Sequence, residues 1–452
     1  MVGKAVAVAL GLLATLIVAP VSAQTPATPT GPTPTTTPAP TPGGGPLQPP
    51  VLGTDVGIQI PGVLFPPLTG IDPLYPAPVQ GPLTLTPSIT IEEEYNDNVF
   101  LDNNDKRSDF ITRISPGLAL AMQQPGFNLT ASYAFSGEIY AKESQLNEIA
   151  NSHRFLASLS YQATPRVGLS LSDGFVYSKN SNAASVAGVS TGRQTSLSNV
   201  LAAGLNFQAT QRLTWNASAA YTIQRFDAAS TQDSSQRFGA TGTQDSDTYH
   251  IGTGLSYAVT PRMDLTAGYD VEYFVIDREK PSTTHTPRIG AAYRFTPTLT
   301  ASVSGGPSFL VSDGDTTVTP AGSATVAKTT SWGAMSGFYD RSISTAGGLG
   351  GPSDVQTVGG SVVVGTYLRG LIVSFNPRYT MTKSEGSSRS KSDVKALSLN
   401  LSASYQLARY VAVVASYTFF HQTTDSGDVR AADADQNRIS VGLRFGYPIS
   451  FY

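Results

Sequence analysis

The sequence predicts an all-β fold: a transmembrane, antiparallel, up-and-down β-barrel that follows a proline-rich N-terminal arm. Three observations predict it. More than ten segments of the 452-residue chain alternate apolar and small polar residues with a period of two. Short turns alternate with long polar connections, as in outer-membrane barrels. Only 13% of the residues are charged, against about a quarter in soluble domains.

The first 23 residues have the features of a secretory signal peptide. Lys4 supplies the positive charge, residues 5–18 form an apolar stretch, and Val21-Ser22-Ala23 is a small-residue cleavage site. The apolar stretch is shorter than the roughly 20 residues that a membrane-spanning helix needs. We therefore expect residues 1–23 to be removed on secretion.

Residues 24–82 differ in composition from the rest of the chain. They hold 17 of the 31 prolines and open as a Thr/Pro repeat. Proline lacks the backbone N–H and fixes φ, so a helix or a central strand is excluded. This segment is predicted to be a disordered periplasmic arm, either a plain linker or a segment that docks on peptidoglycan or on a partner.

Residues 83–452 are predicted to form the barrel. Each alternating segment has about 10 to 16 residues, enough for a tilted strand to cross a bilayer. A weak strand within 316–327 brings the count to 18, whereas moving 330–342 into a long loop would bring it to 16. The predicted strands are 83–95, 108–122, 126–142, 151–164, 166–177, 194–209, 212–226, 246–260, 262–276, 284–296, 298–311, 316–327, 330–342, 354–367, 370–382, 393–407, 410–421 and 437–447.

The connections between these segments predict which barrel end lies in the periplasm. Several short turns share the pattern of Tyr161 to Arg166, in which an aromatic residue precedes a Thr-Pro turn by three positions. Such aromatic residues are typical of the membrane interface, and short turns are typical of the periplasmic side. The long connections are polar and are predicted at 178–193, 227–245, 277–285, 383–392 and 421–436.

The last predicted strand carries an assembly signal. Gly442, Phe445 and Tyr447 follow the glycine–aromatic–aromatic pattern of last strands that the barrel-assembly machinery recognises. Five residues follow this pattern, so the signal is slightly internal. The machinery is therefore an expected partner, together with outer-membrane lipid and lipopolysaccharide.

The stretch Glu94-Tyr95-Asn96-Asp97-Asn98-Val99-Phe100, the repeated Tyr-x-x-Thr-Pro-Arg turns and Tyr339-Asp340-Arg341-Ser342 resemble a known family. It comprises β-barrel porins and outer-membrane β-barrels found beside bacterial exopolysaccharide biosynthesis genes. The resemblance spans roughly residues 83–447. It implies an outer-membrane pore, a link to polysaccharide-export components, and no catalytic residues.

No residue pattern indicates catalysis or a cofactor. The histidines His153, His250, His285 and His421 have no metal-ligand spacing. Cysteine is absent, which excludes disulfides, thiolate nucleophiles, Cys-ligated metals and a lipid anchor at the cleavage site. The formal net charge of −3 gives no reason to expect nucleic acid.

Successive side chains of a strand point to opposite faces of the sheet, and this strand parity predicts which charged side chains line the lumen. Glu92 and Glu94 are expected inside, whereas Glu93 either faces lipid at the outer rim or is turned inward by a bulge. The mixed charges either pair across the wall or give a weak ion preference. The predicted lumen residues are Arg113, Glu138, Arg154, Asp270, Glu272, Arg288, Lys395 and Arg444.

Three functions are compatible with these patterns. The first is an outer-membrane pore for polar solutes, linked by the resemblance to exopolysaccharide export. The second is a non-conducting barrel that anchors or scaffolds an envelope complex through its arm. The third is an outer-membrane hydrolase of lipid or glycan, whose residues would lie on separate strands.

Overall fold

The computed structural model describes residues 82–179, 190, 195–227, 244–345, 351–365, 368–384, 393–425 and 433–451. The predicted signal peptide and nearly all of the predicted arm lie outside these residues. So do large parts of the predicted loops 178–193, 227–245, 383–392 and 421–436. These features therefore stay predictions.

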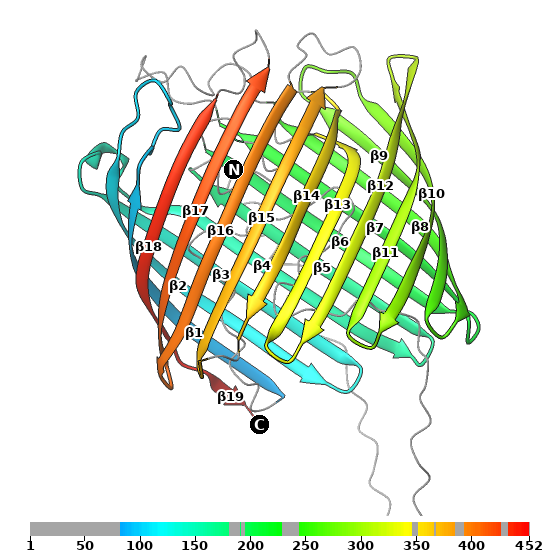
Figure 1. Cartoon of the computed structure of the whole chain (residues 1–452), viewed down its shortest axis with the longest axis horizontal. Helices are drawn as coiled ribbons and strands as arrows, with labels where there is room; N and C mark the ends of the chain where they lie inside the picture. Colours follow the sequence, from blue (N-terminus) through cyan, green and yellow to red (C-terminus); the bar gives the residue numbers. More distant parts are fainter. Residues whose placement is uncertain are drawn as a thin grey trace, which may run out of the picture. The chain divides into compact units, whose positions relative to one another are not determined.

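The described chain forms one antiparallel sheet that closes on itself, which confirms the predicted fold class and the count of 18 barrel strands (Figure 1). Each strand pairs with the next along the chain, and β1 closes the barrel on β18 in continuous register. A short β19 pairs with the first residues of β1 and extends this join. The strands are β1 (Leu83–Asn96), β2 (Asp109–Gln124), β3 (Phe127–Tyr140), β4 (Glu148–Thr164), β5 (Val167–Ser178), β6 (Ser196–Gln208), β7 (Leu213–Phe226), β8 (Ser246–Thr260), β9 (Met263–Ile276), β10 (Ser282–Thr296), β11 (Leu299–Ser312), β12 (Asp315–Thr330), β13 (Gly333–Ser344), β14 (Ser353–Val364), β15 (Leu371–Ser384), β16 (Asp393–Ala408), β17 (Val411–Asp425), β18 (Ala434–Gly446) and β19 (Ile449–Phe451).

Helical structure is minimal in the described part of the chain. The 3-10 turn η1 (Ser144–Leu146) lies between β3 and β4. Within the described ranges, no helix has the length and apolar character needed to cross a membrane.

The two ends of the barrel differ in their connections. At one end, here the turn end, most strands are joined by two residues, as at Pro125-Gly126. Leu83 and Phe451 pair with each other at this end. At the loop end the connections are longer, except for the two-residue turn Asp313-Gly314. Its φ angles of 53° and 86° are left-handed, as a type I′ hairpin turn requires. The weak predicted strand follows this turn directly as β12.

Several strands run further towards the loop end than predicted. β17 continues to Asp425, β18 begins at Ala434, and β10 begins at Ser282. The alternation of apolar residues ends earlier in these strands. The backbone pairing continues beyond it, between residues with polar side chains such as His421 and Asp435. The predicted loops 277–285 and 421–436 are correspondingly too long, whereas the predicted strand 354–367 ends at Val364.

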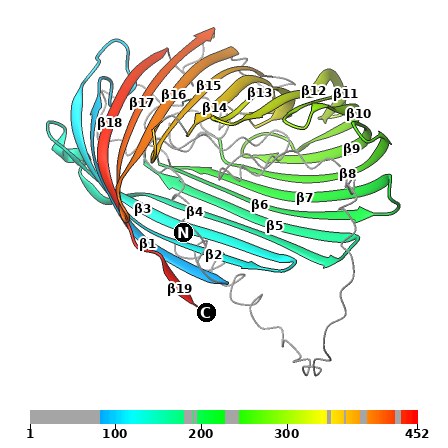
Figure 2. The ribbon, with the colours of Figure 1, turned by 60° about the horizontal axis from the view of Figure 1, so that its bottom comes forward.

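The two faces of the wall have opposite character. Large apolar side chains on the outer face are exposed, among them Ile91, Leu255 and Leu401. Exposed aromatic side chains flank this apolar belt at the turn end, as Tyr161 and Tyr257 do. The buried polar side chains belong to the alternate positions, which face the lumen. Figure 2 shows β1–β9 and β10–β18 as the two facing walls around this lumen.

Candidate pore lining

The register places most of the predicted charged residues inside the barrel. Arg113, Glu138, Asp270, Glu272 and Arg288 all lie on the inner face of the wall. Arg113 pairs with Glu138 and Arg288 pairs with Asp270, while Glu272 lies beside His250. By strand parity, Arg154 and Arg444 also face inward. Arg154 alternates with Phe155, which pairs with the exposed Tyr133, and Arg444 alternates with the exposed Leu443 and Phe445.

The prediction for Lys395 is wrong. Lys395 is exposed and has the same parity as the outward Leu401 and Tyr405, while its neighbours Val394 and Ala396 are buried inside. β16 has no bulge between Lys395 and Leu401, so the side-chain period of two fixes Lys395 on the outer face. It lies near the loop end, where a cation at the membrane interface costs little.

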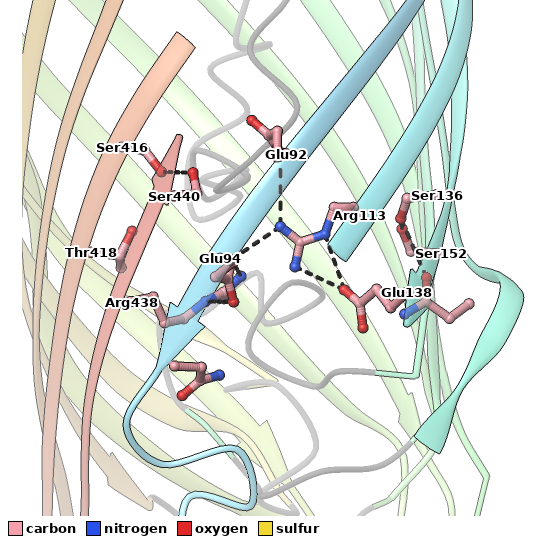
Figure 3. Close-up of polar contacts among 12 residues, drawn as sticks. Glu92, Glu94, Arg113, Ser136, Glu138, Ser152, Ser416, Thr418, Arg438 and Ser440 are labelled. Carbon is pink, nitrogen blue, oxygen red and sulfur yellow. Dashed lines mark hydrogen bonds and ion pairs between the residues drawn. The ribbon is translucent and has the colours of Figure 1, made fainter. Parts of the chain in front are cut away.

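Four neighbouring strands contribute to one ionic network, which we call the seam cluster: Glu92, Glu94, Arg113, Glu138 and Arg438 (Figure 3). Arg438 on β18 binds Glu94 on β1 through two nitrogens, each 2.9 Å from a carboxylate oxygen. Arg113 on β2 lies 3.0 Å from Glu94 and 2.8 Å from Glu138 on β3. The cluster therefore ties the first strand to the last.

The seam cluster is held tightly and carries a net negative charge. Its side chains are at most 6% exposed, and the Tyr140 hydroxyl donates a 2.7 Å hydrogen bond to Glu138. Three carboxylates and two guanidinium groups leave a charge of −1. Bidentate Arg–carboxylate pairs fix geometry as well as charge. The cluster can thus stiffen the wall.

A second group of charges, the far cluster, consists of His250, Asp270, Glu272 and Arg288 on β8 to β10. Its contacts are longer: Arg288 lies 3.3 Å from Asp270, and His250 lies 3.5 Å from Glu272. The carboxylates are 20% and 17% exposed. These two carboxylates are more exposed than those of the seam cluster, whereas His250 is 5% exposed.

Hydroxyl groups line much of the wall between β10 and β18, here the hydroxyl wall, beside inward charged side chains such as Arg288 and Arg438. Inward serines and threonines on neighbouring strands hydrogen-bond in pairs, for example Thr357 with Thr380. Figure 3 shows the pair Ser416–Ser440. Small side chains of this kind leave room for water and offer both donors and acceptors. The other pairs are Thr286–Ser308, Ser302–Thr325, Ser304–Ser323, Ser374–Ser402 and Asn400–Thr418.

The motif behind the family resemblance joins β1 to β18 at the loop end. Asp97 accepts hydrogen bonds from the Asn437 backbone and side chain, both at 2.7 Å. The fully buried Asn98 donates to the Asp435 carbonyl at 2.8 Å. Glu93 points outward and accepts a 2.8 Å hydrogen bond from Thr112, with no bulge in the register.

Two contacts reach across the lumen near the loop end. Ser190, in the connection after β5, exchanges two 2.8 Å hydrogen bonds with the Gln422 side chain on β17. Thr345, after β13, donates to Gln224 on β7 at 3.3 Å. Each contact spans six strands along the sheet order. The lumen is therefore narrower at the loop end than the closed sheet alone would make it.

One member of the seam cluster, Arg438, is not among the residues predicted from the sequence. Arg438 shares its parity with the predicted Arg444, but it lies only one residue inside the predicted strand 437–447. Nothing in the sequence indicates that Tyr140 hydrogen-bonds to Glu138. Among the described residues, no group of His, Cys, Asp or Glu could hold a metal ion.

No protein-family model and no curated protein sequence matches this chain. Among solved structures, OpdO of Pseudomonas aeruginosa has a TM-score of 0.39 and 13% identity, over 82% of this chain and 98% of that one. OccAB4 of Acinetobacter baumannii has a TM-score of 0.39 and 12% identity, over 83% and 100%. The P. aeruginosa siderophore receptor PirA has a TM-score of 0.39 and 10% identity, over 80% of each chain. Likeness at this level assigns no function.

Proposed function

We propose that this protein is an outer-membrane pore for polar solutes that performs no covalent chemistry. One observation carries the proposal: the same strands present exposed apolar side chains outside and hydroxyl and charged side chains inside. Lipid requires the first face and water the second. Barrels of about 16 to 18 strands are wide enough to leave an aqueous channel.

The chain ends give the orientation that we propose. Leu83 and Phe451 both lie at the turn end, and short turns face the periplasm in outer-membrane barrels. In this orientation the arm predicted at residues 24–82 would lie in the periplasm. Deleting residues 24–82 should leave the conductance unchanged, because the described barrel closes without them.

Two arguments support a polysaccharide as the solute. The hydroxyl wall includes exposed hydroxyl groups, as at Ser302 and Thr325, and these offer hydrogen bonds of the kind that sugar hydroxyl groups make. The resemblance to barrels found beside exopolysaccharide genes points in the same direction. Carboxylates and guanidinium groups both face the lumen, so a neutral or weakly charged glycan is favoured over a strongly acidic one.

Conductance of the purified protein in planar lipid bilayers tests the pore. We expect discrete openings in KCl, together with faster migration of the unboiled protein on gels, which reports the folded barrel. A barrel that shifts on boiling but never conducts would contradict the pore and favour the anchoring function.

Current block by a neutral dextran oligosaccharide tests the solute class. We expect the block to weaken when Ser302→Ala and Thr325→Val together remove one exposed hydroxyl pair. Thr283→Val on the outward face of β10 is the matched control and should behave as the unmodified chain does. Equal block in all three proteins would leave the pore intact but refute the glycan.

A further inference from the structure

The ladder between β12 and β13 stops before the loop end. Its register ends at Gly322 and Arg341, whereas β12 continues to Asp315 paired with β11. Residues 315–321 therefore have no partner strand on the β13 side within the described residues. Figure 1 shows β12 continuing beside β11 while β13 turns away from it.

The loop end of β13 lies inside the lumen. Ile343 has the parity of the outward Tyr339, yet it packs with Phe274, Ile276 and Leu310, which face inward from β9 and β11. These four side chains are at most 5% exposed. Since Ile343 contacts side chains of β9 and β11, which lie beyond β12 in the sheet, the end of β13 has left the wall and lies against the inner face of these strands.

A proline stands on the unpaired edge. The Thr329 N–H of β12 points to β11, where it donates to Thr298. Backbone N–H groups alternate between the two neighbours of a strand, so even-numbered residues of β12 direct theirs towards β13. Pro320 is one of them and has no N–H to offer. Proline at this position is suited to an edge and disfavours pairing with another strand.

The unpaired edge lies at the depth of the apolar belt. Val318 is 58% exposed on the outer face, and the outward Val311 on β11 lies still nearer to the loop end. Unpaired backbone at membrane depth is tolerated only where it is buried in protein or lines a water-filled cavity. The lumen side is apolar here, because Phe274 and Leu310 lie behind the edge.

We propose that the wall between residues 315–321 of β12 and residues 342–344 of β13 is a lateral portal. Through it an amphiphile with an acyl or alkyl chain passes between the lumen and the outer half of the bilayer. The chain displaces Ile343 from the apolar strip of Phe274, Ile276 and Leu310, and the polar end stays in the wet lumen. The portal rests on the proposed function, because it requires a membrane-embedded barrel around water.

Photolabelling in vesicles tests the portal. The full chain is reconstituted with palmitic acid that carries a diazirine in its alkyl chain, and labelled peptides are mapped after illumination. Outward residues such as Val303 should be labelled in any membrane barrel. The portal predicts additional label on the inward Phe274 and Leu310. Label confined to outward residues would overturn the proposal.

Blocking the portal distinguishes it from entry through the mouth of the barrel. Ala321→Trp places a bulky group at the portal, and Ala327→Trp places the same group on the same face of β12 further from it. We expect Ala321→Trp to abolish the inward label and Ala327→Trp to retain it. Inward label that survives Ala321→Trp would overturn the proposal.

Two further measurements complete the test. If Ala321→Trp does not fold, Thr319→Cys modified with a bulky maleimide after folding provides the same block, since the chain has no other cysteine. Efficient formation of disulfide-linked dimers by Val318→Cys in vesicles would show that a second copy of the chain covers this edge. That result would overturn the portal. If neither the unmodified chain nor its variants conduct KCl but Phe274 and Leu310 are still labelled, the proposed pore would be refuted and the portal would not.

Discussion

Two joins between neighbouring strands are built in opposite ways. The join of β1 and β18 is paired up to Asn96 and Arg438 and is reinforced by the Glu94–Arg438 pair. The join of β12 and β13 stops at Gly322 and Arg341, and no ion pair crosses the remaining length within the described residues. The first join is reinforced by side chains, and the second is left partly unpaired.

Chain connectivity explains the difference. β12 and β13 are joined by a two-residue turn, so they stay together at the turn end even where their loop ends separate. β1 and β18 have no such connection, and only side chains and ladder bonds hold the barrel shut there. Charge and hydrogen bonding are therefore concentrated where the chain itself supplies no link.

Removing the charge of Glu94 should have the largest effect. Glu94→Gln leaves Arg113 and Arg438 without a shared carboxylate, and breaking a buried ion pair costs about 3–5 kcal/mol. Urea unfolding of the barrel in lipid vesicles measures the loss. Glu93→Gln, one residue away on the outer face, should change the stability by less than about 0.5 kcal/mol. Equal losses would show that the seam cluster does not lock the join.

A methyl group at Gly442 should weaken the same join. An added Cβ would lie 2.4 Å from the Ile91 carbonyl oxygen and 2.9 Å from the Glu92 Cα, so β1 and β18 must move apart. Overpacking of this kind costs about 1–3 kcal/mol. The matched change Gly446→Ala meets its nearest atom at 3.8 Å and should be tolerated. Similar unfolding midpoints for the two variants would contradict the tight contact.

Loss of the Asn98 side chain should have a smaller effect. Asn98→Ala removes its hydrogen bonds to the Asp435 carbonyl and from the Asp102 backbone, each worth about 0.5–1.5 kcal/mol. Protease cleavage of the β1–β2 loop in the folded barrel should accelerate. Asn104→Ala, at an exposed position of the same loop, serves as the control. Equal acceleration in both variants would show that Asn98 does not hold the join of β1 and β18.

The smallest effect is expected at the open join. Pro320→Ala restores an N–H that has no partner on β13, so the stability should change by less than about 1 kcal/mol. Ala324→Pro removes an N–H of the same orientation where the ladder is intact, and it should cost clearly more. Thermal unfolding compares the two. Equal destabilisation would mean that β12 is paired along its whole length.

The sequence predicts where strands lie and which side chains face outward, because both depend on the local alternation of residues along each strand. The period of two in residues 127–140 appears in the structure as an exposed Tyr133 and a buried Glu138. The same rule placed Glu92 and Glu94 together on one face. It was misapplied at Lys395, where the apolar neighbours Leu397 and Leu401 already defined the outer face.

Which inward residues meet was decided only by the tertiary structure. Arg438 and Glu94 are 344 residues apart, and their contact depends on the register with which the last strand reaches the first. The departure of β13 from β12 depends on the packing of Ile343 against strands β9 and β11. Side-chain alternation follows from the geometry of each strand alone. Closure and inward folding depend on where distant strands come to lie, which no local pattern records.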